Sequence, residues 1–212
     1  MKRSWALKRA FDVIVSGLGL VLLSPLMAAI WLRIQGTADG PVIYSGVRAG
    51  RGGRAFKMYK FRTMVVNADR IGGPSTSDDD TRLTATGRRL RRYKLDELPQ
   101  LYNVFKGDMS LVGPRPEVLT EVEKYTQEEL HLLDVRPGIS DWASLRFSNE
   151  GEILKGQADP HQAYLQLIRP EKVQLGLEYV RRARFADDLA ILARTLVLPI
   201  MRRGDDKGRA AG

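Results

Sequence analysis

The first forty residues contain one long apolar stretch. The segment "AFDVIVSGLGLVLLSPLMAAIWLRI", from Ala10 to Ile34, carries only two charges, Asp12 and Arg33. A helix needs about 20 such residues to cross a bilayer, so the length of the stretch favours a membrane segment. A cleaved signal peptide is disfavoured, because the stretch is too long and no small-residue cleavage pattern follows it before the polar "RIQGTADG".

The pair Ser24-Pro25 lies close to the middle of this stretch. Proline removes a backbone donor and clashes with the preceding turn, so the helix is predicted to kink or break there. The serine hydroxyl can donate to a carbonyl that the proline leaves without a partner. A straight transmembrane helix is the ordinary alternative, and it would put the two ends of the segment on opposite sides of the membrane.

Basic residues flank the apolar stretch on both sides, and they argue for a bend. Those nearest to it are Lys2, Arg3, Lys8, Arg9, Arg48, Arg51 and Arg54. Because lysine and arginine close to a membrane favour its cytoplasmic side, both ends are predicted to lie on that side. We therefore predict a re-entrant membrane helix over residues 1–36, broken at Ser24-Pro25, in preference to a span.

A β-hairpin is predicted over Pro41–Met64, where apolar character partly alternates and "GRGG" marks the turn. The glycines match no phosphate-loop spacing, so a turn is favoured over a phosphate cradle. Near the end of the hairpin Lys60 and Arg62 share one strand face, and Tyr59 and Phe61 take the other. The basic face is either a site for phosphate or a solvated edge.

A polar stretch and a short basic helix, "GRRLRRYK", follow the hairpin. The acidic run "DDD", Asp78 to Asp80, resembles the metal-binding motif of a nucleotide-sugar glycosyltransferase, but a solvated helix entry is the favoured interpretation. The basic helix lacks the interleaved aromatic residues that stack bases. A membrane or a substrate is as reasonable a partner for it as nucleic acid.

Two adjacent acids, Asp96 and Glu97, open the segment "DELPQLYNVFKG". This segment is predicted to be a helix with Pro99 in its first turn and Gly107 at its end. Carboxylates in a first turn face the positive end of the helix dipole, so capping alone could account for them. Neighbours on a helix point about 100° apart, so the two acids suit separate tasks around one centre better than a shared proton.

One such pair of tasks is attack on phosphorus by one carboxylate while the other holds a cation. That chemistry needs Mg²⁺ and arginines to neutralise the phosphoryl oxygens. Arg91 and Arg92 precede the acids, and Arg115 lies between Pro114 and Pro116, which fix its backbone. Arginine is well suited to bidentate contact with phosphate.

The rest of the chain is mainly helical in pattern. Helices are predicted from Val118 to Leu133 and across "HQAYLQLI" and "PEKVQLGLEYVRRA", with "RPGIS" as a turn between them. The final "DDLAILARTLVLPIMRR" is predicted to be an amphipathic, interfacial helix. The expected fold class is α+β: a mostly helical catalytic domain with a short β-hairpin over residues 37–201, followed by a flexible basic tail over 202–212.

Composition narrows the function classes. The 212 residues leave room for one globular domain, and a formal charge of +9 indicates an anionic partner or surface. The chain has no cysteine and two histidines far apart in sequence. Disulfides and thiolate metal sites are therefore excluded, and a histidine zinc site is disfavoured.

Taken in order, four motifs resemble a known family. They are "KRAFDVIVSGLGLVLLSP", "KMYKFRTM", "GRRLRRYKLDELPQLYNVFKGDMSLVGPRPE" and "RPGIS". Together they resemble the bacterial sugar transferase family, the monotopic phosphoglycosyl transferases. The chain begins directly at the membrane segment, which is similar to the small, single-domain members of that family.

The resemblance implies a two-step reaction at the cytoplasmic face of the bacterial inner membrane. An aspartate attacks the β-phosphate of a UDP-sugar, UMP leaves, and the phosphosugar passes to a polyprenyl (undecaprenyl) phosphate. By motif, Asp96 corresponds to the nucleophile and Glu97 to the Mg²⁺ ligand, and Ser24-Pro25 is the break in the membrane helix. The implied phosphate-binding residues are Arg115, Lys60, Arg91 and Arg62.

The chain departs from the family pattern after "RPGI". Members often continue as "RPGITG", whereas this chain reads "RPGISDWASLRFSNEGEIL". The identity of the sugar therefore stays open, as do the polyprenol length, the pathway and the oligomeric state, a homodimer included. Besides UDP-sugar and polyprenyl phosphate, membrane lipid is the expected partner, and nucleic acid is not.

Two alternatives from other classes remain at this stage. One is a membrane-tethered basic module that binds without catalysis. The other is a one-step glycosyltransferase that uses "DDD" as a metal ligand and releases UDP.

Overall fold

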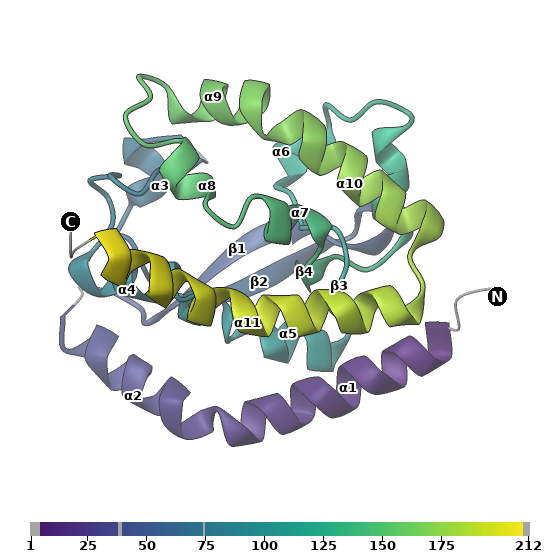
Figure 1. Cartoon of the computed structure of the whole chain (residues 1–212), viewed down its shortest axis with the longest axis horizontal. Coiled ribbons are helices and arrows are strands. Elements are labelled where there is room, and N and C mark those ends of the chain that lie inside the picture. Colours follow the sequence, from purple (N-terminus) through teal and green to yellow (C-terminus); the bar gives the residue numbers. More distant parts are fainter. Residues whose placement is uncertain (1–4, 38–39, 74, 210–212) are drawn as a thin grey trace.

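The chain starts with two helices that meet at a bend. The computed structural model describes residues 5–37, 40–73 and 75–209, except for the side chains of residues 69 and 198–209. Helices α1 (Trp5–Leu22) and α2 (Ser24–Gln35) run along the lower edge of the molecule in Figure 1. Within these ranges no single helix has both the length and the apolar character to cross a bilayer, but α1 and α2 meet the criterion as a pair bent by 59°.

The bend has a local cause. Pro25 has no N–H, so the carbonyl of Val21, four residues earlier, loses its helical donor. The hydroxyl of Ser24 donates to that carbonyl at 2.7 Å. Helical bonding resumes at once, since the N–H of Met27 donates to the carbonyl of Leu23 at 2.8 Å. The predicted break at Ser24-Pro25 is confirmed, while the re-entrant course of the pair stays a prediction.

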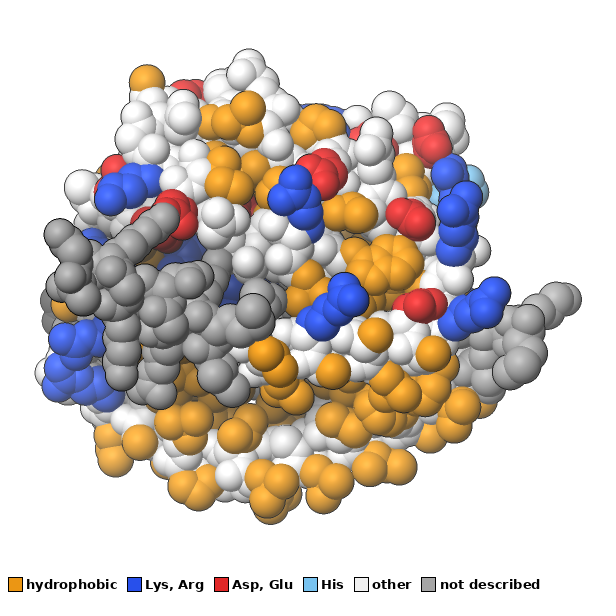
Figure 2. All heavy atoms as spheres, in the orientation of Figure 1, with side chains coloured by type: hydrophobic (Ala, Val, Ile, Leu, Met, Phe, Trp, Pro, Cys, Tyr) orange, Lys and Arg blue, Asp and Glu red, His pale blue; other side chains and the backbone are white. Residues whose placement is uncertain are grey.

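The outer faces of α1 and α2 are apolar. Figure 2 shows hydrophobic side chains gathered along the same lower edge, with charged side chains higher on the molecule. The exposed large apolar residues of the pair are Trp5, Leu7, Ile14, Leu18, Val21, Leu22, Leu26, Trp31 and Leu32. A patch of this extent on a protein surface indicates contact with lipid or with another protein.

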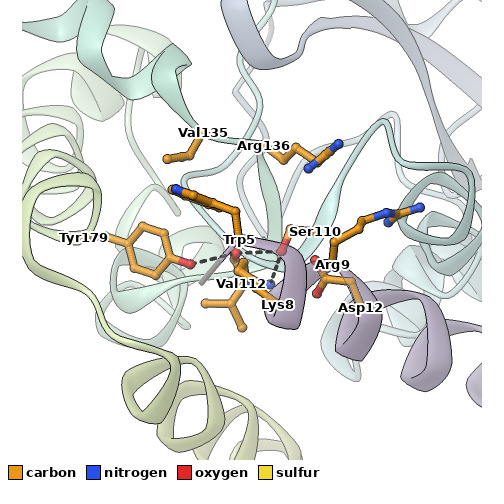
Figure 3. A pocket seen from close by; sticks show the side chains of 9 residues that line it. All are labelled: Trp5, Lys8, Arg9, Asp12, Ser110, Val112, Val135, Arg136 and Tyr179. Atoms are coloured by element: carbon orange, nitrogen blue, oxygen red, sulfur yellow. Dashed lines mark hydrogen bonds between the residues drawn. The ribbon is translucent and has the colours of Figure 1, made fainter. Parts of the chain in front are cut away.

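The opposite face of α1 is polar and buried against the rest of the protein. Asp12 is 2% exposed, and its Oδ1 accepts the N–H of Leu111 at 3.1 Å. The guanidinium of Arg9 donates to the carbonyls of Val104 and Phe105 at 2.6 and 2.8 Å. Asp12 thus lies inside the protein, where it satisfies a buried backbone donor. Figure 3 shows both side chains projecting from α1.

A buried ion pair also joins α1 to the C-terminal helix α11 (Phe185–Arg209). The Nζ of Lys8 lies 3.1 Å from Oδ2 of Asp188. The hydroxyl of Tyr179 lies 2.7 Å from Oδ1 of Asp188 and 2.8 Å from the carbonyl of Val112.

Replacing Asp188 with Asn removes the charge opposite Lys8. We expect the free energy of unfolding in detergent to fall by about 3 kcal/mol.

The control for this prediction is an exposed pair elsewhere. Arg182 lies 3.8 Å from Glu178 on the surface of the next helix toward the N-terminus. The change Arg182→Gln should shift the unfolding free energy by less than about 0.5 kcal/mol. Equal effects of the two substitutions in denaturant titrations would contradict a stabilising role for the buried pair.

The predicted hairpin is confirmed. Strand β1 (Ile43–Ala49) pairs antiparallel with β2 (Ala55–Phe61), and a short 3₁₀ turn, η1 (Arg51–Gly53), connects them. Gly52 and Gly53 have φ values of 66° and 75°, a region that favours glycine. The glycine cluster therefore makes the turn.

A second, smaller sheet was not predicted. Strand β3 (Ser110–Val112) pairs in parallel with β4 (Gly138–Ser140). The last three residues of "RPGIS" form β4, so the prediction of a turn there was wrong. The reason is tertiary, because a three-residue strand carries no periodic pattern of its own and forms here only by pairing with a distant segment.

Helices make up most of the remaining structure, which confirms a mostly helical α+β fold. They are α3 (Ala68–Ile71), α4 (Ala85–Arg92), η2 (Leu95–Glu97), α5 (Gln100–Lys106), α6 (Leu119–Val122), η3 (Glu129–Asp134), α7 (Trp142–Arg146), α8 (Glu150–Ile153), α9 (Pro160–Leu167) and α10 (Arg169–Arg182). The single helix predicted over Val118–Leu133 was wrong, since α6 and η3 are separate. Buried Glu129 accepts the N–H of Thr126 at 2.8 Å and so starts a new turn.

The C-terminal helix covers much of the segment that was predicted to be a tail. Helix α11 runs to Arg209, whereas the flexible basic tail was placed at 202–212. Residues 210–212 lie outside the described residues. The division into a membrane segment and a catalytic domain stays a prediction.

Two of the three apolar clusters among the described residues position the elements around the acid turn. The larger one joins the hairpin to α5, β3, α10 and α11 through Met58, Val104, Met109, Leu111, Val112, Tyr179, Ala183 and Ile191. The smaller one joins α2 to the hairpin and α4 through Ile30, Ile34, Val42, Phe61 and Leu90, and Leu95 and Leu98 pack against it. Because Leu95 and Leu98 flank the acid pair, this cluster fixes the turn that carries Asp96 and Glu97.

Candidate active site

The two acids occupy a turn of their own ahead of α5. The sequence predicted one helix for "DELPQLYNVFKG", but the structure has the 3₁₀ turn η2, which contains both acids, and then α5. Lys94 has a left-handed φ of 56° just before the turn, and Pro99 stands at the start of α5. Gly107 ends α5 with a φ of 103°, as predicted. Asp96 and Glu97 are 4% and 8% exposed.

Glu97 is held by two cations from other parts of the chain. Its Oε1 accepts from Nζ of Lys60 at 2.9 Å and from a terminal nitrogen of Arg115 at 2.6 Å. Burial alone would raise the pKa of the Glu97 carboxyl, but Arg115 and Lys60 outweigh it and hold that pKa well below its usual range. Glu97 is therefore an ionised carboxylate whose two bonds to cations end on the same oxygen.

Asp96 lies in a different environment. Burial, and then the charge of Glu97, raise the pKa of the Asp96 carboxyl, while Lys60 and Arg91 oppose the rise. Its Oδ1 and the Nε2 of Gln100 are the two buried side-chain atoms without a hydrogen bond in the part of the chain that the structure describes. An unmade hydrogen bond in the interior is costly, and a donor and an acceptor left open in one segment indicate a place for a ligand.

The structure brings together most of the cations that the sequence singled out. Lys60 from β2 and Arg115 from the loop after β3 both contact Glu97, although these three residues are far apart in sequence. Arg91, near the end of α4, acts electrostatically on Asp96. Arg62 has another partner, because its Nε donates to the carbonyl of Pro41 at 2.6 Å. A phosphate-binding role of Arg62 stays a prediction.

Arg48 is a further cation on this side of the hairpin. Tyr44 pairs with Lys60 across the two strands, and Arg48 is on the same strand face as Tyr44. A Cβ at Gly46, between them, would lie 3.1 Å from a terminal nitrogen of Arg48 and 3.3 Å from the Tyr44 hydroxyl. Burial lowers the pKa of Arg48, and Tyr44 and Glu117 oppose this effect. The alternation of side chains along β1 would have allowed Arg48 to be identified from the sequence as a further cation on this face of the hairpin.

The acidic run "DDD" has a structural role. Asp80 binds Arg82, with 2.7 Å between Oδ2 and a terminal nitrogen, and Oδ2 of Asp79 accepts the N–H of Gly156 at 3.2 Å. No group of three or more potential metal-ligating side chains occurs among the residues that the structure describes. The favoured interpretation as a helix entry was wrong, because α4 begins later and is capped by Thr84. The run organises a loop around Arg82.

Comparison with known proteins decides the family. Residues 3–202 match the profile of the bacterial sugar transferase family. The chain belongs to this family. The resemblance seen in the sequence motifs is thereby confirmed, and the family match includes the acid turn, the hairpin and the bent helix pair.

Named relatives of this chain come from several bacteria. It is 42% identical over 142 residues to the UDP-N-acetylgalactosamine-undecaprenyl-phosphate N-acetylgalactosaminephosphotransferase of Aeromonas hydrophila, with 66% of the chain and 34% of the relative covered. It is 36% identical over 214 residues to the undecaprenyl-phosphate galactose phosphotransferase of Salmonella typhimurium, with 93% and 41% covered. The exopolysaccharide production protein ExoY of Sinorhizobium fredii is 33% identical over 213 residues, with 93% and 87% covered.

The relatives of this chain differ in length and in the sugar for which they are named. The chain spans 34% and 41% of the lengths of the first two relatives, which are thus much longer proteins. The same two relatives are named for different sugars, N-acetylgalactosamine and galactose. Family membership therefore leaves the sugar open.

Proposed function

We propose that this chain is a phosphoglycosyl transferase that moves a sugar-1-phosphate from a UDP-sugar to polyprenyl (undecaprenyl) phosphate and releases UMP. The names of its relatives support the acceptor and the transfer of a phosphosugar. The observation that carries the proposal is the difference between the two adjacent acids. Glu97 is ionised and bound to two cations, whereas Oδ1 of Asp96 accepts no hydrogen bond from the described residues.

The proposed reaction has two displacements at phosphorus. First, an oxygen of Asp96 bonds to the β-phosphorus of the UDP-sugar, and the bond from that phosphorus to the bridging oxygen breaks, so that its electron pair leaves with UMP. Second, a phosphate oxygen of the polyprenyl phosphate attacks the same phosphorus. The bond to Asp96 then breaks, and a polyprenyl-diphosphate-sugar is the product.

The other residues of the site supply charge and position. A phosphoryl group at Asp96 brings negative charge close to Lys60, Arg91 and Arg115, which stabilise it as charge develops. Glu97 holds Lys60 and Arg115 on one oxygen, so both cations are oriented before substrate binds. The carboxylate of Asp96 would otherwise repel the negatively charged phosphate of the donor. These cations reduce that repulsion.

The acid turn also fits a bound Mg²⁺. This ion is usually held by one or two carboxylates together with substrate phosphate and water. Glu97 has one oxygen outside its ion pairs, and Asp96 Oδ1 has no partner among the described residues, so the donor set is suitable. Glu97 would hold the ion, which when bound neutralises phosphoryl oxygens. Dependence on Mg²⁺ is part of the proposal.

The nucleotide product tests this function. When the protein in detergent or nanodiscs is mixed with UDP-sugars, polyprenyl phosphate and Mg²⁺, we expect chromatography to show UMP as the nucleotide product. Release of UDP would point to the one-step glycosyltransferase. If no nucleotide is released but duplex DNA binds in a salt-dependent way, the protein is a non-catalytic basic module.

We also propose that α1 and α2 form a re-entrant hairpin in the inner membrane, with the catalytic domain on the cytoplasmic face. The exposed apolar faces of both helices and the net charge of +9 support this placement. The polar face of α1, which binds the domain through Asp12 and Arg9, supports a helix that stays close to the domain.

Cysteine labelling tests the topology directly, because the chain has no cysteine of its own. Single variants Ala6→Cys and Gln35→Cys place a thiol at exposed positions near the two ends of the pair. We expect membrane-impermeant reagents to label both from the cytoplasmic side only, as they label the control Arg146→Cys. Labelling of the two ends from opposite sides would establish a span instead.

A further inference from the structure

A pocket with both polar and apolar lining residues lies next to Arg115, a partner of the acid pair. It lies between the loop after β3 and helices α7, α9 and α10, and its lining includes Arg115, Glu117, Tyr164, Arg169 and Lys172. Arg115 also contacts Glu97. Arg115 therefore contacts the acid pair and also lines the pocket. A ligand whose phosphate binds Arg115 can place its neighbouring group in the pocket.

Hydrogen-bonding groups face one another in this pocket. The hydroxyl of Tyr164 donates to Oε1 of Glu117 at 3.3 Å, a long bond that a better donor or acceptor could replace. Burial raises the pKa of Tyr164, so its hydroxyl stays protonated and able to donate. The ammonium of Lys172 lies 5.0 Å from the centre of the Tyr164 ring and is paired with Glu150.

The charge balance of the pocket disfavours a second phosphate there. Three carboxylates, those of Glu117, Glu121 and Asp141, line it together with the cations. Arg169 and Lys172 are already paired, with Glu129 and Glu150 respectively. A neutral ligand group is therefore favoured over an anionic one.

The chemistry of the lining selects between the two neutral parts of a UDP-sugar. Among the described residues the lining has no asparagine or glutamine side chain that could match the donor and acceptor edge of uracil. It does have carboxylate acceptors and the phenolic hydroxyl of Tyr164, which suit the hydroxyl groups of a sugar. Apolar residues such as Val173 and Leu132 complete the lining and suit the carbon face of a sugar ring.

We propose that this pocket binds the sugar ring of the donor, with Glu117 accepting from a sugar hydroxyl and Tyr164 donating to one. This inference rests on the proposed function, since it assigns the sugar end of that substrate. It makes Glu117 and Tyr164 the residues that distinguish sugars, such as epimers that differ in the direction of one hydroxyl. Arg115 connects sugar binding to the phosphoryl group.

Sugar selectivity provides the kinetic test. For wild type, Tyr164→Phe and Glu117→Gln, kcat/KM is measured with UDP-glucose, UDP-galactose, UDP-N-acetylglucosamine and UDP-N-acetylgalactosamine. A site that loses a hydrogen bond to a substrate hydroxyl loses discrimination, so we expect kcat/KM for the best sugar to fall by about 10- to 100-fold, mainly through KM. The ratio between epimers should change by about 5-fold or more. Tyr102→Phe, at an exposed position on α5 outside the pocket, is the control and should leave these ratios unchanged.

A structural role for Tyr164 gives a different result. If Tyr164→Phe and Glu117→Gln slow every sugar by the same factor, or change none of them, the inference is overturned. Retained unfolding temperatures in both variants exclude loss of the fold as the cause of a change in selectivity.

Direct binding separates this inference from the proposed function. Calorimetry in nanodiscs compares the affinity of UDP-sugar with that of UDP, for wild type and for Tyr164→Phe. We expect wild type to bind the UDP-sugar more tightly than UDP, and the substitution to reduce that difference by about 10-fold. If this difference in affinity is observed but no UMP is released, the proposed catalytic function is contradicted and the sugar pocket is retained. Equal effects of Tyr164→Phe on the affinities for UDP and UDP-sugar, with normal UMP release, would overturn the sugar pocket and keep the catalytic function.

Discussion

Replacing Asp96 with Asn should lower turnover of the UDP-sugar by about 10⁴-fold or more, the size of effect seen when a covalent nucleophile is removed. An amide cannot form the bond to phosphorus, while the cations at Glu97 stay in place because their bonds end on Glu97. The measurement is UMP release per enzyme over time, with the best donor sugar. The same variant should still bind the UDP-sugar.

The folded state of this variant provides its internal control. Because Asp96 Oδ1 is buried without a hydrogen bond from the described residues and burial raises the pKa of its carboxyl, a neutral amide should leave the unfolding temperature equal or higher. Asp134→Asn, at an exposed position, is the matched substitution and should leave turnover within about 2-fold of wild type. Turnover near the wild-type rate in Asp96→Asn would remove the proposed nucleophile.

Replacing Arg115 with Met should lower kcat/KM by about 10²- to 10³-fold, because the proposed mechanism then loses a cation that stabilises the phosphoryl charge. It should also destabilise the fold, since buried Glu97 keeps only Lys60 as a partner at that oxygen. Breaking a fully buried pair costs about 3–5 kcal/mol. The Arg115 side chain is 33% exposed, so solvent screening reduces the expected loss to about 2 kcal/mol.

The matched control replaces an arginine whose ion pair is exposed. Arg146 lies 2.9 Å from Glu171, and both side chains are largely accessible to solvent. Arg146→Met should change kcat/KM by less than about 2-fold and the unfolding free energy by about 0.5 kcal/mol. Similar effects of the two substitutions in kinetics and denaturant titration would mean that the Glu97 cluster is an ordinary surface network.

The features that could be predicted from the sequence have local causes. Pro25 has no backbone N–H whatever its tertiary surroundings, so the break between α1 and α2 could be predicted from the sequence alone. The hairpin follows from alternation and from Gly52 and Gly53 at the turn, and Gly107 ends α5 because its φ of 103° favours glycine. The adjacency of Asp96 and Glu97 was visible as well, and the roles proposed for them come from the family resemblance of the surrounding motif.

The features that could not be predicted depend on contacts between distant segments. Strand β4 exists because it pairs with β3, and Asp12 is buried because Leu111 presents a backbone donor to it. The separate environments of the two acids also depend on tertiary structure. Only the fold brings Lys60 and Arg115 to one oxygen of Glu97 and leaves Oδ1 of Asp96 without a donor among the described residues. The pocket at Tyr164 has the same origin.

Mass spectrometry of trapped enzyme tests the central claim most directly. The protein is incubated with its donor UDP-sugar and Mg²⁺ but without polyprenyl phosphate, quenched, and digested. The account predicts a phosphosugar on the peptide that contains Asp96, absent from the Asp96→Asn variant and lost when polyprenyl phosphate is added. Release of UMP by an enzyme that carries no phosphosugar on this peptide would contradict it.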